Sequence, residues 1–465
     1  MTSPVGSRAA SPRPPRPSPG VPRAYRFPRF ERRRLPNGLQ LVVAPVDKLP
    51  LVTVLVLFEA GAVCDPADRE GVAQLTCNLL LEGTEELDGS ALAERFERLG
   101  ASVDAHADWD RAAISLTALT ENLSSAFNLL AEVVRSPAFR QREVERLQAE
   151  RIAELLQLRA EPRGLADELF SRFLYAKGSR YALPEGGTEA SVERITRDDV
   201  VEFFRSRYQS CTATVIVVGD VSVDAAERMV SRQLGGWKGE LRPTPAAIDR
   251  PVRTTRAVHL VAKPDAPQSE LRLGHVGLPR HHPDYFPVVV MNAILGGLFN
   301  SRVNLNLREV HAYTYGAFTA FDWRRQAGPF AAYTAVRSDA TDAAAREVLL
   351  EIDRIREEKV GDEELSLATS YLDGVFPIRY ETTAAIAEAL ATLMVNDLPA
   401  DYFDSYRENV RGVTADAVLD VARRHLHPDA LQMVVVGDPA TVRAPLESMA
   451  FGPLTLYDAQ GRPLS

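Results

Sequence analysis

The sequence predicts an α+β fold made of two homologous halves, and an internal repeat carries this prediction. Residues 195–200 (ITRDDV) recur as residues 413–418 (VTADAV), and residues 217–220 (VVGD) recur as residues 435–438 (VVGD). Both pairs are 218 residues apart, and the same offset brings the apolar run at 42–44 onto the run at 260–262. One register therefore spans both copies, and each copy contains a Thr-capped helix followed by a buried strand that ends in Gly-Asp.

Proline-rich sequence separates the two halves and predicts the domain boundaries. Periodicity fails after residue 239, where Pro243, Pro245 and Pro251 occur. A linker of about 15 residues lets two domains fold onto each other as a clamshell. We therefore expect an N-terminal half at 31–238, a linker at 239–255, a C-terminal half at 256–452 and a tail at 453–465.

The N-terminal half shows strand and helix patterns in turn. β-Branched runs at 39–44 and 51–58 predict strands, and the apolar run at 71–82 predicts a helix. Ser90 precedes apolar residues at helical spacing, so we expect a helix from Ser90 to Gly100. The remaining patterns of this half predict a strand at 112–119 and helices at about 121–135 and 140–160.

Composition excludes several classes of protein. The 465 residues are 45% hydrophobic and 25% charged, as in a soluble globular protein with several domains. A net charge of −9 argues against a nucleic-acid-binding protein, which presents a basic face. We expect no membrane span, because no apolar run approaches ~20 residues. Three scattered cysteines favour a reducing compartment over a disulfide framework.

The N-terminus has a distinct composition. Its first thirty residues contain six Arg, eight Pro and no acidic residue. Proline at this density blocks the amphipathic helix of a transit peptide, and no apolar h-region of a secretion signal is present. We expect residues 1–30 to form a disordered basic tail. We also expect the protein to be cytoplasmic in a bacterium, with a periplasmic or organellar location as the alternative.

The helix predicted at 71–82 has the frame of a metal-binding helix, with a Gly-x-Ala opening and a Leu-x-Glu-Gly-Thr exit. This frame resembles the pitrilysin/insulinase (inverzincin) metallopeptidase family, whose helix reads G-x-A-H-x-x-E-H-x-x-x-x-G-T. The resemblance covers roughly residues 32–450. In the family, the two His and a Glu well downstream bind zinc, and the Glu between the His deprotonates water. The matching positions here are Gln74, Cys77, Asn78 and Glu154.

These four positions form a degenerate metal site. Carboxamides offer only a weak neutral oxygen, whereas zinc takes thiolate, imidazole and carboxylate. We therefore expect a packed helix with Cys77 as a small buried hydrophobe and no metal bound by this chain. A salvage site made from Cys77 and Glu154 would lack imidazole and a general base. The eight histidines predict no second metal site, neither in the loop that contains His282 nor at the helix end that contains His425.

The C-terminal half carries a second motif of this family. Residues 301–315 (SRVNLNLREVHAYTY) resemble the segment S-R-L-x-x-x-L-R-E-x-x-x-x-x-Y, and the resemblance assigns substrate contacts beside the zinc to Arg308 and Tyr315. Guanidinium and phenol donors can bind a peptide carbonyl or the oxyanion that develops on it. The alternative is that Arg308 makes a surface ion pair with a nearby Glu and Tyr315 packs in the following strand.

The resemblance implies both a fold and a function. Each half is expected to be a duplicated α/β sandwich with mixed or antiparallel sheets flanked by helices. The chain is expected to be a zinc-free, non-catalytic subunit that completes a peptidase chamber and supplies Arg308 and Tyr315 to a zinc-bearing homologue. Such a heterodimer would act on peptides or unfolded protein segments. The alternatives are a structural or peptide-binding scaffold subunit and an independent zinc metallopeptidase with a displaced site.

Overall fold

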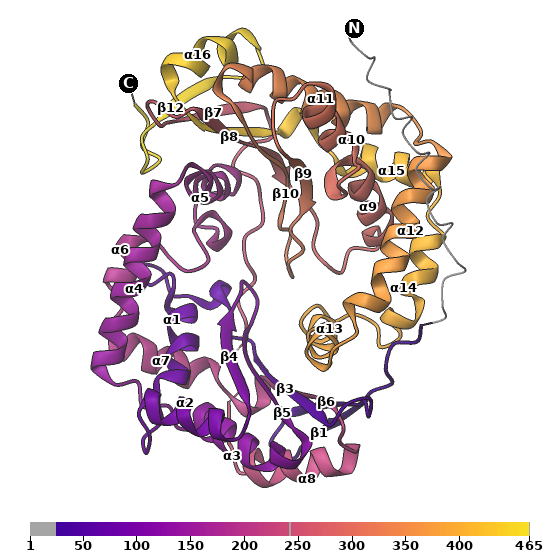
Figure 1. The fold of residues 1–465 in the computed structure, drawn as a ribbon. Helices are drawn as coiled ribbons and strands as arrows, with labels where there is room; N and C mark the ends of the chain where they lie inside the picture. Colours follow the sequence, from indigo (N-terminus) through magenta and orange to yellow (C-terminus); the bar gives the residue numbers. More distant parts are fainter. Residues whose placement is uncertain (1–24, 241–242, 465) are drawn as a thin grey trace, which may run out of the picture.

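The computed structural model describes residues 25–240 and 243–464, and these residues form two halves around two mixed sheets (Figure 1). The first sheet has the strand order β1-β2-β6-β3-β5-β4. Its neighbouring strands are antiparallel except β2 and β6, which are parallel. Its strands are β1 (Glu31–Arg34), β2 (Gln40–Pro45), β3 (Leu51–Phe58), β4 (Ser102–Ala107), β5 (Ala112–Leu119) and β6 (Ala213–Gly219).

The second sheet follows the same plan, with the order β12-β7-β11-β8-β10-β9. Its strands are β7 (Ala257–Ala262), β8 (Gln268–Val276), β9 (Ala317–Phe321), β10 (Pro329–Arg337), β11 (Gln432–Gly437) and β12 (Leu454–Tyr457). β7 is parallel to β11 and β12. Val43 pairs with Val217 in the first sheet, and Val261 pairs with Val436 in the second, so the strands predicted from the repeat are neighbours in both sheets.

The duplicated unit is the whole half, since each half contributes one six-stranded sheet rather than two smaller repeats. The helix starts predicted from the repeat are confirmed. The side chain of Thr196 accepts a hydrogen bond from the Asp199 N–H, and the side chain of Thr414 accepts one from the Ala417 N–H. These bonds satisfy backbone donors that have no partner within the helix.

The helices of the N-terminal half connect and cover its strands. They are α1 (Val72–Leu79), α2 (Gly89–Arg98), α3 (Leu123–Arg135), α4 (Gln141–Ala160), α5 (Pro162–Leu174), α6 (Glu189–Glu193), α7 (Arg197–Arg207) and α8 (Val223–Leu234). The predicted helix starts one residue before Ser90, at Gly89, and its N-cap Asp88 lies two residues before Ser90. The carboxylate of Asp88 caps α2, because it accepts a hydrogen bond from the Ala91 N–H at 2.8 Å.

The helices of the C-terminal half are α9 (Tyr285–Asn292), α10 (Arg302–Asn304), α11 (Thr341–Glu357), α12 (Asp362–Arg379), α13 (Thr383–Val395), α14 (Tyr402–Arg411), α15 (Ala415–His425) and α16 (Pro439–Ser448). Two π-helical turns, η6 (Ala293–Gly297) and η7 (Leu305–Val310), extend α9 and α10. The run from Tyr285 to Val310 is long and apolar enough to span a membrane by composition. Half of the most apolar part of this run is buried inside the protein, as in a core helix. The run is also interrupted at Leu298, whose backbone is extended.

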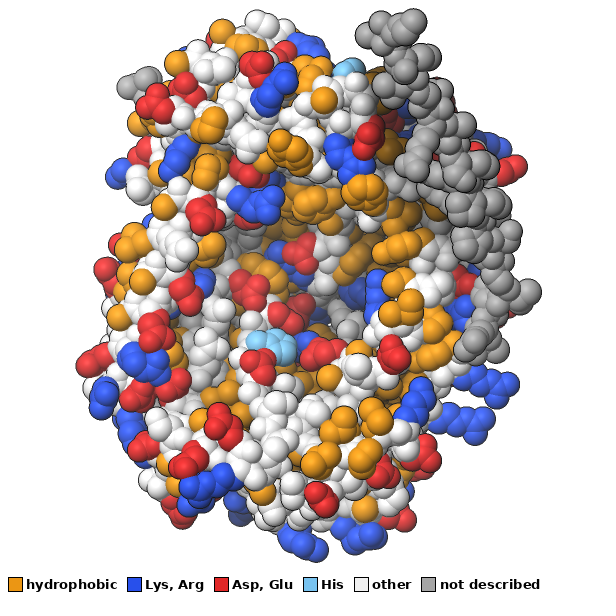
Figure 2. All heavy atoms as spheres, in the orientation of Figure 1, with side chains coloured by type: hydrophobic (Ala, Val, Ile, Leu, Met, Phe, Trp, Pro, Cys, Tyr) orange, Lys and Arg blue, Asp and Glu red, His pale blue; other side chains and the backbone are white. Residues whose placement is uncertain are grey.

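Each half covers the sheet of the other with one helix. α5 of the N-terminal half packs on β8 and β11, and α13 of the C-terminal half packs on β3 and β6 (Figure 1). At the second contact, Thr53 Oγ1 and Thr383 Oγ1 share a hydrogen bond at 2.8 Å. The two halves are therefore joined by exchanged helices as well as by the linker, and Figure 2 shows the hollow that remains at the centre of this face.

Two segments that were expected to be tails belong to the fold. Phe27 is 6% exposed and its ring stacks on that of Phe403 at 4.4 Å, while the Tyr25 hydroxyl donates to the Tyr380 carbonyl at 3.0 Å. The tail prediction is thus wrong for residues 25–30, and residues 1–24 lie outside the described residues. At the other end, β12 pairs with β7 although it lies within the tail expected at 453–465. Residues 25–30 pack on the core of the C-terminal half, and β12 takes the edge position of the second sheet that β1 takes in the first.

Candidate functional site

A buried ion pair fixes the start of α1, the helix that has the metal-binding frame. The fully buried carboxylate of Asp65 accepts hydrogen bonds from the N–H groups of Gly71 at 2.7 Å and Ala73 at 2.8 Å, and it pairs with Arg180 at 2.7 Å. Gly71 has a φ of 100°, and a Cβ on it would lie 2.7 Å from the Gly186 carbonyl oxygen. Glycine is therefore required at this turn.

The three residues that replace H-x-x-E-H lie in three environments. Gln74 Oε1 is buried and has no hydrogen-bond partner in the described part of the chain. Cys77 is fully buried, its Sγ donates to the Ala113 carbonyl at 3.8 Å, and burial raises the pKa of its thiol to about 12. Asn78 is exposed. A reactive thiolate is therefore not available on α1 at neutral pH.

The fourth position, Glu154, faces solvent beside the guanidinium of Arg151. Its side chain is 63% exposed and pairs with Arg151 at 3.1 Å, and Arg151 Nε donates to the Gly186 carbonyl at 3.1 Å. A Cβ on Gly186 would lie 2.0 Å from Gln74 Oε1 and 2.3 Å from Arg151 Nη2, so these two side chains close over the glycine. Because a guanidinium repels a divalent cation and the Cys77 thiol is enclosed in the core, the four residues do not fit a zinc ion.

Arg308 lies on the π-helical turn η7, with the neighbouring Leu307 buried in the core of the C-terminal half. Its guanidinium stands 3.8 Å from the ring centroid of Phe299 and pairs with Glu309 at 2.7 Å. The side chain retains 19% exposure. Arg308 does form the ion pair of the alternative interpretation, and its cation–π contact also orients it toward the space beside Phe299.

Tyr315 does not pack in the following strand. It is 94% exposed, and no hydrogen bond joins its hydroxyl to any described residue. Tyr315 and Arg308 line one cavity of about 610 Å³, together with Gly296, Phe299 and Phe318. A Cβ on Gly296 would lie 2.4 Å from the Thr319 N, so the wall of this cavity packs directly on β9. The structure therefore brings the two predicted residues to one accessible surface.

An adjoining cavity contains charged residues that the sequence interpretation missed. It measures about 380 Å³ and shares Arg163, Gly316 and Phe318 with the first. Arg272 forms its floor, bonded to Asp167 at 2.6 Å and to Glu270 at 2.9 Å. The available signal was the pair Glu270 and Arg272, two charged residues at alternate positions of one strand. Arg163 and Asp167 come from α5, so both halves build this cavity.

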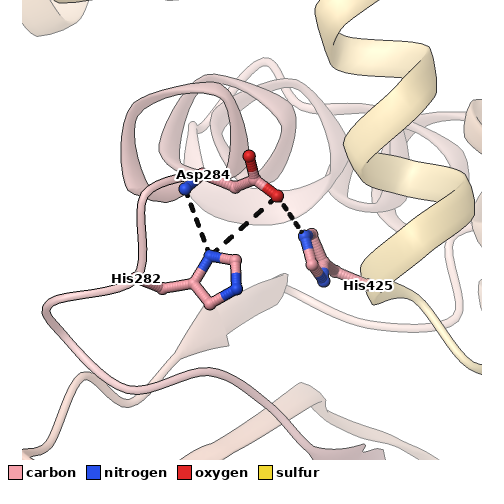
Figure 3. A group of neighbouring side chains, drawn as sticks. All are labelled: His282, Asp284 and His425. Atoms are coloured by element: carbon pink, nitrogen blue, oxygen red, sulfur yellow. Dashed lines mark hydrogen bonds and ion pairs between the residues drawn. The ribbon is translucent and has the colours of Figure 1, made fainter.

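The sequence predicted no metal site at the loop that contains His282 or at the helix end that contains His425, but the structure brings these two histidines to one carboxylate. His282, Asp284 and His425 meet where the chain enters α9 and leaves α15, and their ligand atoms all lie within 4.8 Å of one another (Figure 3). The three residues are separated by up to 143 positions in the sequence, which is why spacing alone did not bring them together.

Comparisons with known proteins match most of the chain. The family model described as "Insulinase (Peptidase family M16)" matches residues 41–181, and that described as "Peptidase M16 inactive domain" matches residues 194–372. The chain is 22% identical to an "Uncharacterized zinc protease" of Rickettsia felis over 366 residues, which is 78% of this chain and 86% of that protein. It is 22% identical to "Non-peptidase homolog YmxG" of Helicobacter pylori over 393 residues, which is 84% of this chain and 90% of that protein.

Among solved structures, the chain is similar to a crystal structure of a peptidase M16 inactive domain from Pseudomonas fluorescens. The two are 26% identical with a TM-score of 0.83, and the alignment covers 88% of this chain and 98% of that one. The two-half architecture with one mixed sheet in each half is therefore a shared fold.

Proposed function

The chain belongs to the insulinase family, peptidase family M16, and we propose that within this family it is a zinc-free, non-catalytic subunit. In this proposal it completes a peptidase chamber with a zinc-bearing homologue and supplies Arg308 and Tyr315 to the substrate. The partner contributes the H-x-x-E-H helix and its zinc. The substrates are peptides or unfolded protein segments that fit the enclosed space.

The environment of α1 supports the absence of catalysis by this chain alone. Zinc peptidases need imidazole and carboxylate ligands and a general base that reaches the metal-bound water. Gln74 and Asn78 supply neither ligand, and Cys77, at the position of the base, is inside the core. This arrangement also argues against an independent peptidase, since Glu154 is engaged with Arg151.

The exposure of Tyr315 is the observation that carries the proposal. Tyrosines that stabilise this fold are buried, as Tyr175 and Tyr181 are at 1% and 0% exposure. Tyr315 instead leaves its whole ring and hydroxyl in solvent, on the same cavity as the Arg308 guanidinium. Donors placed in this way can meet the charge that develops on a scissile carbonyl held by a second subunit.

The test is reconstitution with a zinc-bearing homologue that carries H-x-x-E-H. We expect Arg308→Ala and Tyr315→Phe each to lower the turnover number by ~10²–10³-fold, the range for loss of an oxyanion donor, with complex formation unchanged. Tyr313→Phe is the matched control, because Tyr313 stacks on His311 at 5.0 Å two residues away and is not among the residues that line the cavity. Turnover is measured with a fluorogenic peptide, and assembly by size exclusion.

Two results would contradict the proposal in different ways. Full turnover in both variants at unchanged complex yield would mean that the chain is a scaffold subunit without a role in catalysis. The ion pair between Arg308 and Glu309 is the observation that favours this alternative. Chelator-sensitive hydrolysis by this chain without a partner would leave the independent peptidase. We propose that the complex is located in the bacterial cytoplasm, because three free, scattered cysteines favour a reducing compartment.

A further inference from the structure

The C-terminal half contains a group of metal-ligand side chains far from the degenerate helix α1. His425 Nε2 lies 2.6 Å from Asp284 Oδ2, and His282 Nδ1 lies 3.9 Å from the same oxygen (Figure 3). The side chains are partly buried, with exposures of 26% for His282, 18% for Asp284 and 12% for His425. Three ligand atoms therefore converge at a place that solvent still reaches.

We propose that His282, Asp284 and His425 form a binding site for one divalent transition-metal cation of the Zn²⁺ class. Two imidazole nitrogens and one carboxylate oxygen are ligands that Zn²⁺, Co²⁺ and Ni²⁺ accept, with water completing the coordination. Ligand bonds of about 2.0–2.2 Å in a tetrahedron place the ligand atoms roughly 3.4 Å apart. The observed separations of 2.6 and 3.9 Å lie on either side of that value, so small side-chain rotations suffice.

The backbone already orients one ligand. The Asp284 N–H donates to His282 Nδ1 at 3.1 Å, so the ring proton is on Nε2 and the Nδ1 lone pair faces the cluster (Figure 3). A cation takes over this lone pair at the expense of that hydrogen bond. His425 Nε2 donates to the Asp284 carboxylate, so cation binding also requires the ring proton of His425 to move to Nδ1, which frees the Nε2 lone pair. His425 is the last residue of α15, and Asp284 precedes α9, so the cation links two helices that pack together.

Arg424 is the competitor for the same carboxylate. Its Nη1 lies 2.5 Å from Asp284 Oδ2, but its side chain is 56% exposed and can leave this position without disturbing the core. The arrangement therefore allows two interpretations with opposite consequences. If the cluster serves only as an ion-pair network, Arg424 strengthens it. If it is a cation site, Arg424 weakens the binding of the metal by repulsion and by occupying the shared oxygen.

The experiment uses the full chain after chelator treatment and removal of the chelator. CoCl₂ is titrated at pH 7.5 while the visible absorption of Co²⁺ is recorded, ZnCl₂ is then added as a competitor, and the melting temperature is measured with and without Zn²⁺. We expect one equivalent of Co²⁺ to bind, Zn²⁺ to displace it, and saturating Zn²⁺ to raise the Tm by roughly 5 °C. These readouts are independent of peptidase activity.

Variants distinguish a specific metal site from nonspecific binding of Co²⁺. His282→Asn can still accept the Asp284 N–H, as asparagine does in Asx turns, and it leaves the contact between Asp284 and His425 intact. We expect this variant and His425→Gln to weaken Co²⁺ binding by at least ~100-fold, beyond the ~10–100-fold that loss of a supporting partner costs. Arg424→Ala is expected to bind Co²⁺ more tightly than the wild type. His427→Gln is the matched control, because His427 lies two residues after His425 in the sequence and is not one of the three ligands.

The proposal is overturned if no Co²⁺ absorption and no Tm shift appear. It is also overturned if His282→Asn and His425→Gln bind Co²⁺ as the wild type does, or if His427→Gln removes binding to the same extent. A weaker affinity in Arg424→Ala would show that the cluster is an ion-pair network.

Discussion

The substitution Cys77→Glu tests how α1 is oriented. It restores the residue type that deprotonates water in the family motif, yet the structure predicts that it destabilises the protein. Cys77 is fully buried in the core of the N-terminal half, with its Sγ 3.8 Å from the Ala113 carbonyl oxygen. A glutamate on an active zinc helix must instead reach a solvent-filled site.

The magnitude follows from the cost of keeping a carboxyl group neutral. Burial at position 77 disfavours the charged form of the introduced carboxyl group, so this group is protonated in the folded state. Its pKa in the folded state therefore rises above the unfolded value of ~4.3. At pH 7 this costs ~4 kcal/mol of unfolding free energy, since each pH unit above ~4.3 contributes ~1.4 kcal/mol. Stability is therefore retained below pH ~4.3 and lost as the pH rises.

The assay is urea unfolding of Cys77→Glu and Cys77→Gln between pH 5 and pH 8. Gln has the size of Glu and shares its overpacking cost of ~1–3 kcal/mol, but it does not titrate. We expect the two variants to differ by ~1 kcal/mol at pH 5 and by ~4 kcal/mol at pH 7. Equal stability of both variants at pH 7 would refute the reasoning, because it would mean that the side chain at position 77 reaches solvent.

Three further predictions concern stability. Asp65→Asn should lower the unfolding free energy by ~3 kcal/mol in urea, because it leaves the Arg180 charge without its buried partner; a change below ~1 kcal/mol would mean that water replaces the carboxylate. Phe27→Ala should cost ~3 kcal/mol through loss of stacking on Phe403, and an unchanged urea midpoint would show that residues 25–30 do not hold the C-terminal half. Burial lowers the pKa of His259 to about 4, so the folded state holds this imidazole in its neutral form. The difference from the unfolded state contributes about 3 kcal/mol to the unfolding free energy above pH 6.5, and this stabilisation is lost as the pH falls toward 4. His259→Phe should remove this part of the pH dependence, and an identical pH profile in that variant would contradict the assignment.

Local patterns in the sequence determined much of the fold. The strands predicted at 51–58 and 112–119 have those bounds as β3 and β5, because β-branched and apolar runs of this length favour extended segments that are buried in a sheet. The repeat offset predicted equivalent strands in the two halves, and the structure shows that these strands are neighbours in both sheets. The prediction that the degenerate site binds no zinc also comes from this level, because the residue types at positions 74 and 78 are not among the usual zinc ligands.

Only the tertiary structure decided which surfaces meet. The apolar face of α5 indicates that the helix is buried, but no local pattern says that the sheet of the other half covers it. The same holds for β12 and for the meeting of His282 with His425. Periodicity records how a segment divides between core and solvent, whereas contacts between segments far apart in the sequence depend on how all the elements pack at once. For this reason the sequence predicted which chemistry this chain lacks, and the fold decided where its remaining polar groups come together.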